Sequence, residues 1–67
     1  MDEKFYTSDG VVIKPGMKIT NYNGDEDTVI RLLYVENERV RGIITGNRVA
    51  WWVTEKGTFD GSRMQGL

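Results

Sequence analysis

Residues 39–54 contain two β-rich runs on either side of Gly46 and Asn47, and this stretch constrains the fold more than any other. Gly46 and Asn47 suit a two-residue hairpin turn because both residue types tolerate positive φ. Counting outward from this turn predicts a core face made of Val40, Gly42, Ile44, Val49, Trp51 and Val53. The opposite, displayed face is predicted to carry Arg39, Arg41, Ile43, Ala50, Trp52 and Thr54.

The chain has 67 residues and contains neither Cys nor His. This length indicates one small domain, residues 1–67, close to the lower limit for a core that is stable without support. Without Cys there is no disulfide and no thiolate nucleophile. Without His there is no usual zinc site and no Ser–His or Cys–His dyad. The sequence therefore predicts no metal or cofactor, and stability must come from close packing or association.

Turn residues divide the rest of the chain into short β-forming runs. Asp9 and Gly10 predict a first hairpin within residues 5–14, and Pro15 with Gly16 predicts a change of direction before a strand at 17–22. The polar residues 22–27 lack the glycine and glutamate positions of an EF-hand, so a solvated loop is the preferred interpretation. After a charged turn at 55–57, residues 58–64 predict a short terminal element in which Phe59 enters the core, with a single 3₁₀ turn near Lys56 or Ser62.

Residues 28–35 form the most continuously apolar run and predict a strand that lies centrally, bends at a bulge or crosses between sheets. A turn at 36–38 is expected to lead into the strand that begins at Arg39. A two-residue turn would place Tyr34 on the displayed face. A three-residue loop is preferred, because it would bury Ile30, Leu32 and Tyr34 and leave Arg31 in water.

Five or six short strands with closely spaced turns predict an all-β fold, a small antiparallel barrel or sandwich. The strand count, the turn spacing and the Lys14, Pro15, Gly16 breaker are similar to those of SH3-like small barrels in general. An OB-like barrel is the alternative. The similarity identifies no family and transfers no functional residue.

Composition argues against catalysis and against a membrane-spanning protein. The carboxylates cluster in predicted loops, and no phosphate-binding glycine loop or nucleophile elbow is present, so we predict a protein that is not an enzyme. No apolar run approaches the ~20 residues needed to cross a membrane, and no signal-peptide pattern is present, which favours a cytoplasmic location.

Two binding functions fit the predicted displayed face. The preferred one is an interaction module that binds a protein partner, including a second copy of this chain, through Arg39, Arg41, Ile43, Ala50 and Trp52. Trp and Arg are the residue types most enriched in binding hot spots, and a formal net charge of −1 suits a protein partner. The alternative is nucleic-acid binding through Arg39, Arg41 and Trp52, with a base stacked on the indole.

Overall fold

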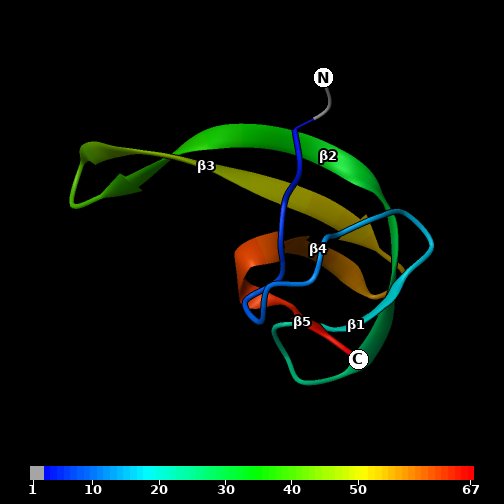
Figure 1. The fold of residues 1–67 in the computed structure, drawn as a ribbon. Coiled ribbons are helices and arrows are strands. Elements are labelled where there is room, and N and C mark those ends of the chain that lie inside the picture. The colour runs from blue at the N-terminus through cyan, green and yellow to red at the C-terminus, as the bar shows by residue number, and fades with distance from the viewer. Residues whose placement is uncertain (1–2) are drawn as a thin grey trace.

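The protein folds into five antiparallel strands, seen in a computed structural model that describes residues 3–67 (Figure 1). The elements are β1 (Lys18–Thr20), β2 (Glu26–Val40), β3 (Ile43–Thr54), β4 (Gly57–Asp60), the 3₁₀ helix η1 (Gly61–Arg63) and β5 (Gln65–Gly66). Their order in the sheet is β4-β3-β2-β1-β5, so β4 and β5 are the two edges and the sheet is open. The predicted all-β, antiparallel architecture is confirmed.

The turn between β2 and β3 lies at Arg41 and Gly42, which corrects the predicted turn at Gly46 and Asn47. Val40 pairs with Ile43, and the two turn residues have φ of 53° and 82°. Positive φ at both central positions is the geometry of a type I′ turn, for which Gly42 is well suited. The turn expected at 36–38 is also wrong, because β2 continues through these residues.

β2 bends as it crosses the sheet. Its register with β3 shifts between Val29 and Arg31, between Leu32 and Tyr34, and between Asn37 and Arg39. Each shift marks a bulge or irregularity, which increases local twist and bends the strand. Figure 1 shows the result: the β2–β3 hairpin arches over the rest of the sheet, and its turn projects away from β1 and β5. The bend predicted for residues 28–35 is confirmed.

The core lies on one side of this bent sheet. It contains Ile13, Ile19, Val29, Ala50, Trp52 and Met64, with Phe5, Met17, Val35 and Phe59 packed against it. The expected first hairpin contributes Ile13, pairs Tyr6 with Val12, and is held by backbone hydrogen bonds from Thr7 to Val11 and from Ile13 to Phe5. Phe59 packs against the core as predicted, and a 3₁₀ turn lies at Ser62, one of its two predicted positions. The predicted burial of three β2 residues is wrong, because each has at least two fifths of its surface exposed: Ile30, Leu32 and Tyr34.

Asp27 is a buried polar residue that ties together segments distant in sequence. Only 3% of its surface is exposed, and its carboxylate accepts hydrogen bonds from Thr54 Oγ1 at 2.6 Å and Asn21 Nδ2 at 3.1 Å. The backbone N–H groups of Thr28 and Lys56 also donate to it. Burial acts to raise the pKa of the Asp27 carboxyl, but these hydrogen bonds outweigh it and hold that pKa below its usual value. The expectation that Asp27 lies in a solvated loop is therefore wrong.

Candidate functional site

The structure separates the five residues that the sequence predicted to form one binding face. Trp52 and Ala50 are buried, with 5% and 4% of their surfaces exposed, whereas Ile43 is 70% exposed. Arg39 and Arg41 are also exposed, at the end of the β2–β3 hairpin. The prediction that Trp52 is displayed is wrong, because packing against Phe59, Ile13 and Met64 turns its side of β3 into the core.

Trp51 takes the place that was predicted for Trp52. Successive side chains of a strand point to opposite faces, so a buried Trp52 puts Trp51 on the face away from the core. Trp51 pairs with Tyr34 on β2 and with Asp60 on β4, which places one residue from each of three strands in a row across this face. Trp51 is half-buried there, and Tyr34 is about half exposed.

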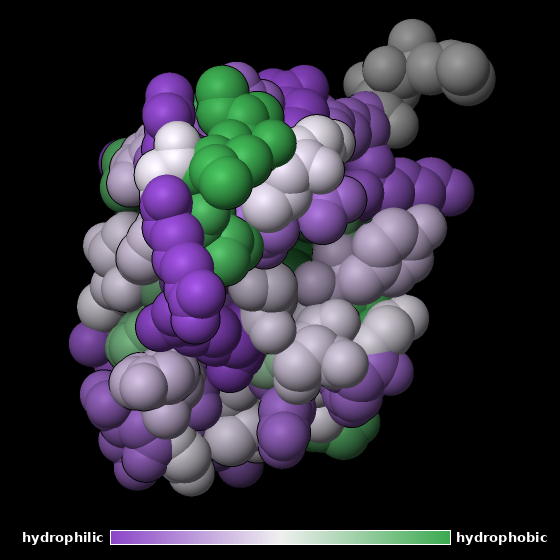
Figure 2. All heavy atoms as spheres, turned by 90° about the vertical axis from the view of Figure 1, so that its left-hand side faces the viewer, coloured by the Kyte–Doolittle hydropathy of each residue, from purple (hydrophilic) through white to green (hydrophobic). Residues whose placement is uncertain are grey.

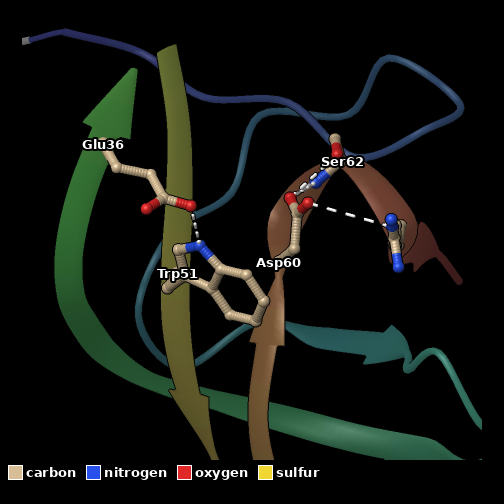
Figure 3. Close-up of polar contacts among 5 residues, drawn as sticks. Glu36, Trp51, Asp60 and Ser62 are labelled. Carbon is tan, nitrogen blue, oxygen red and sulfur yellow. Dashed lines mark hydrogen bonds and ion pairs between the residues drawn. The ribbon is translucent and has the colours of Figure 1, made fainter. Parts of the chain in front are cut away.

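The indole of Trp51 is held in a defined orientation. Its ring stacks on that of Tyr34 with the centroids 6.2 Å apart and the planes inclined by 16°. Its Nε1–H donates to Glu36 Oε1 at 3.0 Å, and Figure 3 shows Glu36 reaching from β2 to the indole on β3. The hydrogen bond uses the Nε1 edge of the indole and the stacking uses one of its faces. The rest of the indole surface is held in position to contact a ligand.

Two neighbouring hollows share Trp51 in their linings, and together we call them the Trp51 groove. One hollow, of about 250 Å³, is lined by Tyr22, Thr58 and Phe59. The other, of about 300 Å³, is lined by Glu36, Glu38, Arg39, Val40 and Val49. Both are also lined by Trp51, Asp60 and Arg63. The groove therefore runs across three strands and the 3₁₀ helix, with an aromatic ring at its centre.

Asp60 is fixed at the junction of the two hollows. It caps η1, and its Oδ1 accepts hydrogen bonds from the backbone N–H and the hydroxyl of Ser62, each at 2.8 Å (Figure 3). Its Oδ2 lies 4.0 Å from Arg63 Nε. The guanidinium of Arg63 in turn lies over the ring of Tyr22, with its carbon 5.6 Å from the ring centroid. The capping bonds leave one carboxylate oxygen of Asp60 available to a cation.

The hollow beside the hairpin is lined by three carboxylates and two guanidinium groups, together with apolar surface from Val40, Val49 and Trp51. Within residues 3–67, no group of three or more His, Cys, Asp or Glu side chains could hold a metal ion. The chemistry that this arrangement offers is attraction of a cation by carboxylates and aromatic faces, next to apolar contact.

The end of the β2–β3 hairpin, residues 36–48, is a second exposed feature, which we call the arm. Val40 and Ile44 are about half exposed, and Ile43 is exposed over most of its surface. Figure 2, which faces the end of the arm, shows hydrophobic side chains beside hydrophilic ones. Glu38 braces the arm internally by accepting hydrogen bonds from Thr45 and Asn47, and Arg48 pairs with Glu3 at 2.7 Å.

Of the residues that line the groove, sequence reasoning assigned only Arg39 to a binding site and missed the rest, including Tyr22, Trp51, Asp60 and Arg63. The available signal was Gly42, which offers a hairpin turn as good as the one at Gly46. A turn at Gly42 continues β2 through 36–38, and the register shift between Asn37 and Arg39 then brings Tyr34 opposite Trp51. Asp60 and Tyr22 carried no local signal, because they reach the groove only through strand pairing and the packing of the loop before β2.

In comparisons with protein-family models, curated proteins and solved structures, nothing matched this chain. Among residues 3–67, no helix has the length and apolar character needed to cross a membrane.

Proposed function

We propose that this protein is a non-catalytic interaction module whose Trp51 groove binds an exposed basic segment of a partner protein. The observation that carries the proposal is the position of Trp51 between two hollows, with its ring oriented by Glu36 and Tyr34 and with Asp60 beside it. A pre-oriented Trp on an open surface is typical of a binding hot spot, because little side-chain entropy is lost when the partner arrives.

The lining of the groove favours a segment that contains Arg or Lys. The long aliphatic parts of these side chains can pack on Trp51 and Val49, while their charged ends reach the carboxylates of Glu36 or Asp60. The two hollows share three residues and together extend over three strands, which suits an extended chain better than a compact small molecule.

The same lining disfavours a nucleic acid. The three carboxylates near Trp51 outnumber the two guanidinium groups of the same hollow and so disfavour phosphates there, and the stacking surface first expected from Trp52 is buried. Arg39 and Arg41 stay exposed on the arm, so binding of a single-stranded oligonucleotide is the alternative outcome of the experiment below.

Self-association through the arm is a second candidate function, favoured by the exposure of Ile43 between Arg41 and Ile44. In this version the tip of the arm, with Arg39 and Arg41, contacts a second copy of the chain. Ile43→Ser is then expected to lower the sedimentation-derived mass without changing the melting temperature, and an unchanged mass would contradict it. A relationship of this open sheet to SH3-like or OB-like folds is a separate proposal about the fold, and it adds no binding residue.

The test of the groove is fluorescence anisotropy with labelled repeating Arg-Ala, Lys-Ala and Glu-Ala peptides and a single-stranded oligonucleotide. The two basic peptides should bind, and Trp51→Leu should weaken them by about tenfold, which corresponds to ~1.4 kcal/mol. Ile30→Ala is the matched control, because Ile30 is half exposed and does not line the groove. Equal binding of Glu-Ala, tighter binding of the oligonucleotide with a steep salt dependence, or an unaffected Trp51→Leu variant would overturn the proposal.

A further inference from the structure

We infer that Tyr22 and Asp60 form a subsite for one Arg or Lys side chain of the partner, and that Arg63 occupies this subsite in the free protein. The inference rests on the proposed function of the Trp51 groove and adds two things to it. It names the position where a cation of the partner binds, and it assigns to Arg63 the role of an internal competitor.

The subsite is built from a fixed carboxylate and an aromatic ring. The side chain of Asp60 is only 13% exposed, and Ser62 fixes its Oδ1 through two hydrogen bonds of 2.8 Å. Its Oδ2 lies 4.0 Å from Arg63 Nε, and Asp60 and Tyr22 line the same hollow. A cation between this oxygen and the phenol ring gains ionic attraction on one side and cation–π attraction on the other. Arg63 shows that a guanidinium fits there, since its carbon lies 5.6 Å from the ring centroid of Tyr22.

Arg63 is held loosely in this position. Its Nε is 4.0 Å from Asp60 Oδ2, which is longer than a hydrogen bond, and its side chain is 64% exposed. Within residues 3–67 it forms no other ion pair or side-chain hydrogen bond. Exposed ion pairs of this kind contribute little to stability, and a long side chain loses entropy when it is held in one place. A cation from a bound partner can therefore replace Arg63 at low cost.

Because of the position of Arg63, its displacement changes binding in the groove. It lines both hollows, at the junction where Trp51 and Asp60 also lie. When the guanidinium rests on Tyr22, it holds the place that a partner's cation needs. The apparent affinity of the groove is then reduced by the fraction of molecules in which Arg63 occupies the subsite. Arg63 thus acts as a specificity-determining residue, because a segment binds well only when its own cation replaces Arg63 in the subsite.

The experiment compares Arg63→Gln with Arg48→Gln for binding of the repeating Arg-Ala peptide. Both substitutions remove one positive charge from an exposed side chain, but Arg48 pairs with Glu3 outside the groove. We expect Arg63→Gln to tighten binding by about three- to tenfold, Arg48→Gln to change it by less than about twofold, and Arg63→Lys to resemble the parent. Asp60→Asn should weaken binding, with its melting temperature measured alongside because Asp60 also caps η1.

The outcomes separate this inference from the function on which it rests. If Arg63→Gln binds no tighter than the parent while Trp51→Leu still loses affinity, the groove binds basic segments but the subsite is wrong. If both glutamine variants tighten binding equally, the tightening comes from the change in net charge, and the role of Arg63 as an internal competitor is also wrong. If the parent binds neither basic peptide, the proposed function fails, and the subsite fails with it.

Discussion

The contact between Gly61 and the core gives a stability prediction that can be worked out from distances. A Cβ at residue 61 would lie 2.5 Å from Ile13 Cδ1 and 3.0 Å from Trp52 Nε1. The first distance is far inside van der Waals contact, so Gly61→Ala must push Ile13 or η1 outward. Overpacking of this kind costs about 1–3 kcal/mol. For a domain of this size each kcal/mol lowers the melting temperature by about 4–8 °C.

A double-mutant cycle shows whether Ile13 is the residue responsible. Ile13→Val removes the Cδ1 methyl group and should cost about 0.5–1.5 kcal/mol by itself. In the double variant the 2.5 Å contact is gone and only the contacts of 3.0 and 3.1 Å with Trp52 remain, so the combined cost should be smaller than the sum of the two single costs. Urea denaturation followed by circular dichroism gives all four free energies of unfolding.

Gly10→Ala is the matched control, because an added Cβ there meets nothing within 4 Å and the cost comes only from its φ of +85°. It should cost about 1 kcal/mol and show no coupling to Ile13→Val. Strictly additive costs for Gly61→Ala and Ile13→Val, or a Gly61→Ala variant as stable as the parent, would refute the packing of Gly61 against Ile13.

Two further stability predictions concern the indoles and Asp27. Trp52→Ala should cost about 3–5 kcal/mol, enough to unfold much of a domain whose total stability is about 3–10 kcal/mol. Trp51→Ala should cost far less, because Trp51 lies on the face away from the core. Equal losses of stability in thermal melts would contradict this assignment of the two indoles to opposite faces. The lowered pKa of Asp27 means that the unfolded chain binds more protons than the folded one as acid is added. The contribution of ionised Asp27 to the free energy of unfolding is therefore present above the usual Asp pKa, and it is lost as pH falls through the lower pKa of the folded state. Asp27→Asn should flatten the stability–pH profile on its acidic side. If that side of the profile is unchanged, Asp27 is not the group responsible.

Local turn chemistry explains which parts of the fold were predictable. The bend at Pro15 and Gly16, the bridge around Asp9 and Gly10 and the 3₁₀ turn at Ser62 depend on a few neighbouring residues. The hairpin turn was not predictable in the same way, because Gly42 and Gly46 both offer positive φ within a β-forming run. Gly46 does have a φ of +92°, but it lies in the irregular pairing opposite Glu38 and not in the turn.

The sequence predicted the type of binding site but not the residues that form it. An exposed Trp with charged neighbours was expected on β3, but Trp52 is buried, and the indole that reaches the surface is that of the half-buried Trp51. A strand has a side-chain period of two, so a local pattern that contains two adjacent indoles does not decide which of them is buried. Burial of Trp52 follows from contacts with Ile13 and Gly61, which belong to other parts of the chain.

The amino-acid sequence alone determined the β-rich character of the chain, most of its turns and the absence of thiol and imidazole chemistry. These properties depend on residue type and on short-range backbone preferences. Only the tertiary structure decided which indole faces the core, and only strand pairing brought Glu36, Trp51 and Asp60 onto one face. The physical reason is that register is set by the best packing of the whole sheet, bulges included, and this packing joins residues that no local pattern connects.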